Sequence, residues 1–235
     1  MTGYAFGFHG ERLVALPSGA LHWPAAGVMV VGDLHLGKSG RMARRGGPLL
    51  PPYETEATLA RLDAVIETVA PARVICLGDS FDDAAAGEEL AEAHRLWLSR
   101  LMAGRDWVWI AGNHDPAPMS LGGRHLAQWR QGPLAFRHIA EAGAAGEVSA
   151  HYHPKARVGG RSRACFLIDR YRVILPAFGT YTGGLPCDHP DLAALMGPEA
   201  IAVLTGSQAV AIPLPRPSPR VAPPSLAVGP RLPQR

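Results

Sequence analysis

A carboxylate and an imidazole stand two residues apart at Asp33 and His35, directly after the apolar run 27–31. The run predicts a buried strand that ends at Gly32. Side chains at alternate positions of an extended chain point the same way. We therefore expect Asp33 and His35 to bind one cation together, while Leu34 turns into the core.

Other predicted strands also end in residues that bind metals. The apolar runs at 73–77, 106–111, 134–138 and 147–150 are each closed or followed by an acid, an amide or a histidine. These residues are Asp79, Asn113, His138, His151 and His153. Together with the first pair they offer two carboxylates, one amide oxygen and four imidazoles. Such a set suits two cations in one pocket, with one carboxylate shared between them.

The mixture of nitrogen and oxygen ligands favours Mn²⁺, Fe²⁺ or Zn²⁺ over Mg²⁺ or Ca²⁺, which prefer oxygen. Two cations about 3.5–4 Å apart can hold a phosphoryl oxygen and activate a water for in-line attack. His114 follows Asn113 and is left over from the ligand set. We expect it to face the substrate, either as a charge stabiliser or as the proton donor to the leaving oxygen.

The elements that position these residues alternate between strand and helix. Apolar residues at helical spacing predict helices at 54–69 and 87–102, which separate the strands at 27–31, 73–77 and 106–111. This order is typical of a layered α/β fold. Sheets of this kind bind ligands at the carboxyl ends of their strands, where the polar residues lie.

Short strands and turns dominate the rest of the chain. A hairpin is predicted from 12–16 and 20–23, and 41–48 is expected to be a basic loop rich in helix breakers. After Asp115, the pattern predicts a second, more antiparallel sheet packed on the first. Its strands are expected at 134–138, 147–150, 164–168, 171–175, 201–204 and 208–212. Residues 1–212 then form one domain, and the Pro- and Arg-rich segment 213–235 is expected to be a disordered tail.

Composition describes an ordinary globular protein. The chain has 235 residues, 47% apolar and 18% charged, with a formal net charge of +3. It has no apolar run near the roughly 20 residues of a membrane helix and no signal-peptide pattern at its start. Its three cysteines suggest neither a disulfide framework nor a cysteine zinc site, so a cytoplasmic location is expected. The net charge is compatible with a polyanionic partner, but arginine-favouring codon usage explains it equally well.

The polar blocks, in their order along the chain, resemble the signature blocks of calcineurin-like metallophosphoesterases. The matching blocks are Gly-Asp-Leu-His at 32–35, Gly-Asp at 78–79, Gly-Asn-His-Asp at 112–115 and His-Tyr-His at 151–153. The resemblance implies an α/β fold of four layers, an α-β-β-α sandwich of two packed β-sheets. The family usually has Gly before the last block, where this chain has Ala150.

The resemblance also implies roles for individual residues. The first metal ion would be bound by Asp33, His35, Asp79 and His153. The second would be bound by Asp79, Asn113, His138 and His151, so that Asp79 bridges the two. His114 would be the catalytic histidine. Mn²⁺ is the favoured metal, with Fe and Zn as alternatives.

A narrower resemblance covers most of the chain except the tail. The blocks at 33–38, 44–46, 136–138, 151–156 and 174–184 are similar to those of the PdeM subfamily, the ligase-associated DNA damage response endonucleases. This implies DNA as the substrate and a functional association with a DNA ligase and a helicase. The alternatives are the same chemistry on a cyclic nucleotide, a nucleotide-sugar or a phosphoprotein, or an inactive scaffold of the same fold.

Some residues near these blocks have two possible roles. Asp82, Asp83 and Asp115 could orient the ligating imidazoles, or the first two could cap helices and turns. The basic residues that could contact a phosphate backbone, or equally be solvated loop charges, are Lys38, Arg41, Arg44, Arg45 and Lys155. Tyr181 could border the site, although chance placement is the simpler explanation. Structural or surface roles are expected for His9, His22, His94, His125 and His189.

Overall fold

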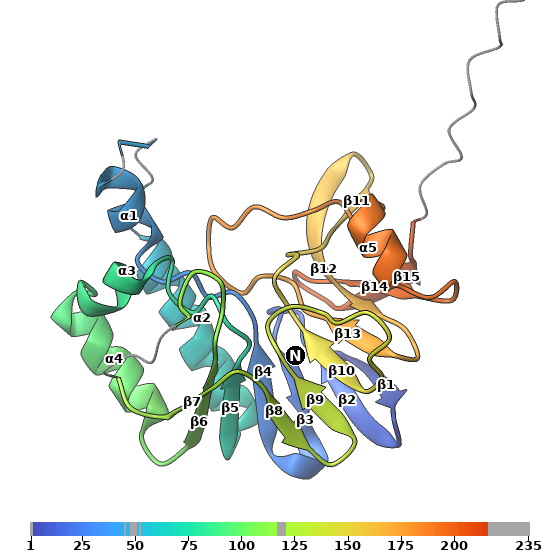
Figure 1. Ribbon diagram of the computed structural model, residues 1–235, viewed down its shortest axis with the longest axis horizontal. Coiled ribbons are helices and arrows are strands. Elements are labelled where there is room, and N and C mark those ends of the chain that lie inside the picture. Colours follow the sequence, from blue (N-terminus) through green and yellow to red (C-terminus); the bar gives the residue numbers. More distant parts are fainter. Residues whose placement is uncertain (1, 45, 48–50, 52, 117–120, 216–235) are drawn as a thin grey trace, which may run out of the picture.

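Two β-sheets pack face to face, with helices on their outer faces (Figure 1). The computed structural model describes residues 2–44, 46–47, 51, 53–116 and 121–215. This arrangement confirms the predicted α-β-β-α sandwich.

The first sheet has seven strands in the order β1-β2-β3-β4-β5-β6-β7. Pairing is antiparallel from β1 to β4 and parallel from β4 to β7. The strands are β1 (Tyr4–Phe8), β2 (Glu11–Ala15), β3 (Leu21–Trp23), β4 (Val28–Val31), β5 (Arg73–Cys76), β6 (Asp106–Ile110) and β7 (Arg124–Leu126). The predicted hairpin is confirmed as β2 and β3, and a short helix η1 (Pro24–Ala26) leads from it into β4. All four residues of β4 are buried, as expected for a central strand that is covered on both faces.

The helices of the first half agree only partly with the sequence prediction. Helix α2 (Glu54–Val69) has the predicted bounds. The predicted helix 87–102 is instead two helices, α3 (Ala84–Glu88) and α4 (Glu92–Met102). The single helix is wrong because Ala91 is not helical, with ψ 141°, and the helix is interrupted where Leu90 packs into the core.

The expected basic loop at 41–48 is also wrong in its first part, which belongs to helix α1 (Lys38–Arg44). Glu54 accepts hydrogen bonds from the backbone N–H and the hydroxyl of Ser39, at 3.0 and 2.8 Å. A carboxylate at this position satisfies a free N–H of the first turn and complements the helix dipole. The helix breakers in this segment follow the end of α1 at Arg44 and do not prevent the helix from forming.

The second sheet is ordered β15-β14-β12-β13-β10-β9-β8, with β11 paired to β12. Pairing is parallel between β13, β10 and β9 and antiparallel elsewhere, which confirms the more antiparallel character. The strands are β8 (Trp129–Gln131), β9 (Leu134–Phe136), β10 (Glu147–Ser149), β11 (Lys155–Val158), β12 (Arg161–Ile168), β13 (Arg172–Ile174), β14 (Ile201–Leu204) and β15 (Val210–Pro213). Helix α5 (Pro190–Leu195) covers the outer face. Strands β1, β7, β8 and β11 and helix α5 were not predicted.

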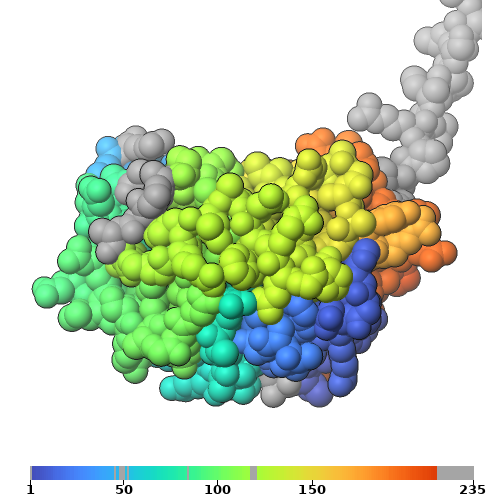
Figure 2. Space-filling view, turned by 60° about the horizontal axis from the view of Figure 1, so that its bottom comes forward, coloured from blue at the N-terminus to red at the C-terminus, as the bar shows by residue number. Residues whose placement is uncertain are grey.

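Three apolar clusters hold the layers together. One lies between the two sheets, where Val30 of β4 and Val148 of β10 belong to the same cluster. A second packs α2 and α4 on the first sheet, and a third packs α5 on the second. The segment that carries β7, β8 and β9, yellow-green in Figure 2, spreads across one face and leads from the first sheet to the second.

The predicted boundary at residue 212 lies next to folded chain. Pro213 ends β15, and Leu214 is buried and donates its N–H to the Ala200 carbonyl at 3.0 Å. The rest of the predicted tail, 216–235, lies outside the described residues. Within the described part of the chain, no helix is long and apolar enough to cross a membrane.

Candidate metal centre

The polar residues after the parallel strands of both sheets meet at one edge of the sandwich. Asp33, Asp79 and Asn113 follow the neighbouring parallel strands β4, β5 and β6. His138 and His151 follow β9 and β10, which are parallel neighbours in the second sheet. The carboxyl ends of parallel strands lie at the same edge of a sheet. The face-to-face packing therefore brings both sets of residues into one site.

Five of the predicted metal ligands share an unusual backbone conformation. Among the described residues, eight other than glycine have a positive φ, and five of those belong to the predicted ligand set. The five are Asp33 (52°), His35 (45°), Asp79 (46°), His151 (69°) and His153 (47°). Left-handed backbone costs about 1–3 kcal/mol at such a residue and concentrates at functional sites.

The expected extended conformation of Asp33-Leu34-His35 is therefore wrong. Alternate residues of this segment are left-handed, and Leu34 between them is buried in the core as predicted. The left-handed turns direct both polar side chains to one side, which is the result that an extended chain was expected to give. His151-Tyr152-His153 repeats the pattern, with positive φ at both histidines.

The first cluster consists of Asp33, His35 and His153, whose ligand atoms all lie within 4.8 Å of one another. Oδ1 of Asp33 is 3.2 Å from Nε2 of His153. These two atoms and Nε2 of His35 are buried, and none has a hydrogen-bond partner among the described residues. Buried polar atoms are rarely left without a partner. Three such atoms facing one another fit a bound cation.

The second cluster surrounds Nε2 of His138. This atom lies 2.9 Å from Oδ1 of Asn113, 3.2 Å from Nδ1 of His151 and 3.3 Å from Oδ2 of Asp79. Nδ1 of His138 donates to the Leu77 carbonyl at 2.7 Å, because a carbonyl can only accept. In the neutral ring Nε2 then carries a lone pair, and it faces the oxygens of Asn113 and Asp79. A positive charge between these atoms, from a proton or a metal ion, would remove the repulsion between their lone pairs.

The electrostatics of the second cluster favour that positive charge. Burial acts to lower the pKa of His138, but Asp79 and Asp33 outweigh it and raise that pKa. Burial also acts to raise the pKa of Asp79, yet His138 and the backbone N–H of His114 lower it to about 2. Asp79 is therefore ionised at neutral pH and ready to bind a metal.

The three aspartates near the sequence blocks, Asp82, Asp83 and Asp115, make different contacts. Asp82 is buried and accepts from Nδ1 of His35 at 2.9 Å, which leaves Nε2 of that ring free to bind a metal. Asp83 caps α3 by accepting from the Ala86 N–H at 2.8 Å. Asp115 accepts from the backbone N–H groups of Asp79, Ser80, Phe81 and Gly112, at 2.7–3.1 Å. It thus fixes the turn that carries Asp79, and burial raises its pKa to about 6.

His114 borders the clusters without belonging to the second one. Its Nδ1 donates to the Asp82 carbonyl at 2.8 Å, and its Nε2 is 4.0 Å from Oδ2 of Asp79. The side chain is 35% exposed, so Nε2 can reach a molecule in solution. His35 and Asp82 form a third group of potential ligands with His114, although Asp82 is already bonded to His35.

The motif glycines allow the close approach of neighbouring groups. A Cβ at Gly112 would lie 2.2 Å from the backbone nitrogen of Asp79, and one at Gly78 would lie 2.6 Å from the His138 ring. A Cβ at Gly32 would lie 2.5 Å from the Cβ of Ala150. The alanine that replaces the family's glycine therefore occupies space that Gly32 leaves empty.

A groove of about 400 Å³ adjoins the second cluster at Asn113 and His138. Gln128, Arg137 and Ile139 complete one side of it. None of these three was predicted as a site residue. Arg137 could have been suspected because it precedes His138, whereas Gln128 carries no sequence signal.

The other residues considered from the sequence lie outside the two clusters or are bonded to neighbouring groups. Lys38 and Arg41 contact Asp82, Arg44 contacts Asp83 and Glu89, and Nζ of Lys155 donates to the Thr182 carbonyl at 3.0 Å. Arg45 lies outside the described residues. Tyr181 is 46% exposed. No group of potential ligands among the described residues includes the histidines assigned structural roles: His9, His22, His94, His125 and His189.

Comparison with known proteins agrees with this geometry. The sequence model of the calcineurin-like phosphoesterase family matches residues 27–218. The chain is similar in structure to the nuclease MPE of Pseudomonas putida, with a TM-score of 0.70 and 28% sequence identity. The match covers 90% of this chain and 100% of the nuclease. A comparison with curated proteins gives no match.

Proposed function

The chain belongs to the calcineurin-like phosphoesterase family and is a metal-dependent phosphoesterase, and from this premise we propose that it cleaves phosphodiester bonds of DNA with two metal ions. The observation that carries the proposal is the pair of adjoining ligand clusters, Asp33 with His35 and His153, and Asp79 with His138 and His151. The unpartnered buried atoms of the first cluster and the converging lone pairs of the second support a cation in each.

The proposed ligand sets follow the two clusters. The first metal ion would be held by Asp33, His35, Asp79 and His153. The second would be held by Asp79, Asn113, His138 and His151. Four imidazoles among the ligands favour Mn²⁺, Fe or Zn over Mg²⁺, and we propose Mn²⁺.

The protein contributes orientation, charge and a proton to the reaction. When bound, the metal ions polarise the phosphoryl group and lower the pKa of water. Asp82 and the Leu77 carbonyl fix the rings of His35 and His138, so that both present Nε2 to the site. We propose that Nε2 of His114 stabilises charge on the phosphoryl oxygens or donates a proton to the leaving oxygen. Its exposure and its contact with Asp82 support this role.

The DNA substrate is proposed from the nuclease MPE and from the sequence blocks of the ligase-associated subfamily. From the same resemblance we propose a role in DNA repair beside a DNA ligase and a helicase, and from the cysteine usage a cytoplasmic location. The fold and the metal centre are equally suited to other phosphodiesters, so the substrate must be tested directly.

The test is hydrolysis by the purified, Mn²⁺-loaded chain. Single-stranded DNA, duplex DNA, cyclic nucleotides, nucleotide-sugars and phosphopeptides are compared at equal concentration. His114→Ala is expected to reduce turnover by roughly 10²–10⁴-fold with metal content unchanged. His94→Ala, on α4, is the matched control and should leave the rate unchanged. Preference for a small substrate with no DNA cleavage contradicts the proposal, and an unchanged rate in His114→Ala removes the role of that residue.

A further inference from the structure

A two-stranded β-hairpin begins two residues after His153 of the metal centre. Strands β11 and β12 pair antiparallel from Lys155↔Ala164 to Val158↔Arg161. Gly159 and Gly160 form the two-residue turn, with φ of 57° and 78°. Positive φ at both positions gives the turn whose twist matches that of the paired strands. The hairpin is therefore a well-defined arm.

The hairpin carries positive charge without acidic residues. Between 155 and 163 there are four basic residues and no Asp or Glu. Arg157 and Arg161 are exposed, and within the described residues neither guanidinium has a hydrogen bond or an ion pair. Arg163 is different, because it donates to the Thr205 carbonyl.

The basic residues of α1 contrast with those of the hairpin. Lys38 and Arg41 are turned toward the buried carboxylate of Asp82, and Arg44 pairs with Asp83 and Glu89. Their charges are thus largely balanced by carboxylates of the protein itself. Arg157 and Arg161 of the hairpin have no such carboxylate partner among the described residues.

The base of the hairpin is fixed to the metal centre. Lys155, the first residue of β11, follows His153 by two positions. Its carbonyl accepts from the Cys187 N–H at 2.8 Å, and its Nζ donates to the Thr182 carbonyl at 3.0 Å. The segment that contains Thr182 also contacts the centre, because the Gly179 N–H donates to the Asp33 carbonyl at 2.9 Å.

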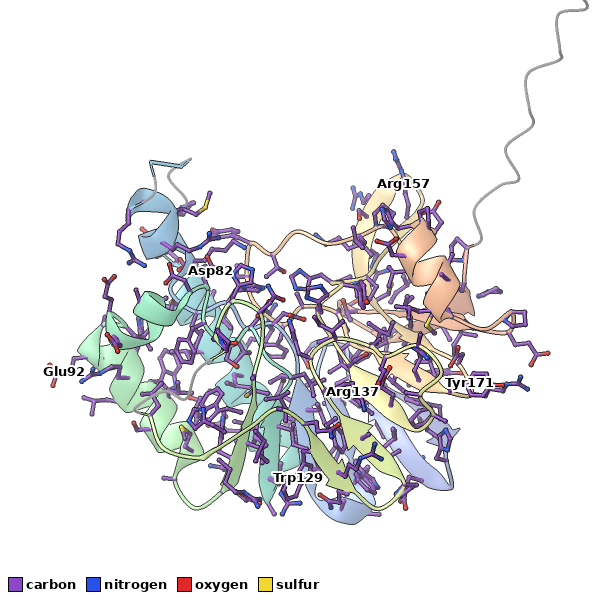
Figure 3. The ribbon with its side chains drawn as sticks, viewed as in Figure 1. Asp82, Glu92, Trp129, Arg137, Arg157 and Tyr171 are labelled. Atoms are coloured by element: carbon purple, nitrogen blue, oxygen red, sulfur yellow. The ribbon has the colours of Figure 1, made fainter. Side chains whose placement is uncertain are left out.

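The hairpin is long enough to contact a nucleic-acid strand that passes through the metal centre. Strands rise about 3.3 Å per residue, so the turn lies roughly 20–23 Å along the chain from His153. Figure 3 shows Arg157 at the outer end of the hairpin, on the same upper side of the molecule as Asp82, whose carboxylate contacts the ring of His35. Lys155, Arg157 and Ser162 line a groove of about 600 Å³, which Pro186 and Asp188 also border. This groove face carries the positive charges of Lys155 and Arg157 against the one carboxylate of Asp188. Arg161 pairs with Val158 and lies on the opposite face, so the two exposed arginines flank the turn from both sides and a nucleic-acid strand must cross the turn to contact both.

We infer that the β11–β12 hairpin binds the phosphate backbone of a nucleic-acid strand whose scissile bond lies at the metal centre. The inference rests on the proposed function and names how that substrate is held. Guanidinium groups bind phosphate oxygens with paired hydrogen bonds, and such contacts position a strand without reading its sequence. The expected binding is therefore sequence-independent and strongly dependent on salt.

The experiment measures binding of labelled DNA oligonucleotides by fluorescence anisotropy in EDTA, where cleavage cannot occur. The double variant Arg157→Gln/Arg161→Gln should bind at least about tenfold more weakly at 0.1 M salt. Its slope of log affinity against log salt should fall by roughly 1.4–1.8, which corresponds to two phosphate contacts. Arg95→Gln/Arg170→Gln removes the same charge from exposed positions on α4 and on the turn before β13, and should bind like the wild type. Lysines at both hairpin positions should restore most of the affinity.

Hydrolysis of the small diester bis(p-nitrophenyl) phosphate separates this inference from the proposed function. The hairpin variant should hydrolyse it at the wild-type rate, because the metal centre is unchanged. If the wild type binds no DNA, or if the hairpin and control variants bind equally well, the inference is wrong and diester hydrolysis still stands. If DNA binding depends on the hairpin but no diester is cleaved, the proposed function fails, and only the binding of DNA by the hairpin is retained from the inference. A larger loss of binding to anionic vesicles or acidic peptides than to DNA would also overturn the inference.

Discussion

Nδ1 of His35 lies 2.9 Å from Oδ1 of Asp82, and both side chains are buried. The same carboxylate accepts from Nε of Arg41 and lies 3.8 Å from Nζ of Lys38. Burial acts to raise the pKa of Asp82, but His35, Arg41 and Lys38 lower it to about 2. One buried carboxylate thus joins helix α1 to a ring of the proposed metal centre.

Replacing Asp82 with Asn should weaken the first metal site. An amide cannot supply the negative charge that orients His35 and increases its basicity as a ligand. Loss of such a partner costs about 10–100-fold in metal affinity, which titration with Mn²⁺ followed by metal analysis can measure. Asp83→Ala is the control, since that cap should cost about 1 kcal/mol of stability and leave metal affinity unchanged. Equal affinity in the Asp82 variant and the wild type would contradict the assigned role.

Asp79→Asn should reduce binding of both metal ions. Oδ2 of Asp79 is 3.3 Å from Nε2 of His138, while the resemblance makes the same carboxylate a ligand of the first ion. Since Asn cannot bridge two cations with a shared charge, the metal content should fall below one ion per chain. The measurement is metal analysis after gel filtration. Loss of a single ion, with the other fully retained, would show that Asp79 belongs to the second cluster alone.

Gly32→Ala should destabilise the fold, because its new methyl would lie 2.5 Å from the Cβ of Ala150. Overpacking of this kind costs about 1–3 kcal/mol, measurable by urea denaturation. The double variant Gly32→Ala/Ala150→Gly removes the clash and should recover most of the lost free energy of unfolding. The two changes would add independently if the contact did not matter.

Much of the fold was predictable because its signals are local. Helix α2 has an apolar face at helical spacing, and β4, β5 and β6 are short apolar runs that end at glycine. Strand β11 was missed although Gly159-Gly160 between two basic strands is a hairpin signal. The break between α3 and α4 depends on the burial of Leu90 by distant residues, which no local pattern shows.

The candidate site was predictable as a set of residues and not as a geometry. Asp33 and His35 were found from their spacing, but their left-handed backbone could not be, because non-glycine residues rarely adopt it. His138 had no local motif and was placed by family order. The meeting of His138 with Asn113 at 2.9 Å depends on the packing of two sheets. The free arginines of the hairpin become visible only once the partners of the other basic residues are known.

Asp106 at the start of β6 links three parallel strands of the first sheet. Nε of Arg73 from β5 donates to it at 2.6 Å, and Nε of Arg124 from β7 donates at 3.1 Å. Burial acts to raise the pKa of Asp106, but the two arginines outweigh it and lower that pKa. Both guanidinium groups also stack on Trp129, at 5.1 and 4.5 Å from the ring centroid.

Asp106→Asn should therefore lower stability in a pH-dependent way. Because the folded-state pKa lies below the unfolded value of about 3.9, the ionised carboxylate stabilises the fold above that pH. The contribution disappears as the pH falls through the folded-state pKa. Urea denaturation should show a loss of about 1 kcal/mol or less at pH 7, since the side chain is 33% exposed, and a shrinking difference toward pH 3. Glu67→Gln, on the exposed face of α2, should change stability by under about 0.5 kcal/mol at any pH. A constant difference between Asp106→Asn and the wild type from pH 7 to pH 3 would show that its charge does not stabilise the sheet.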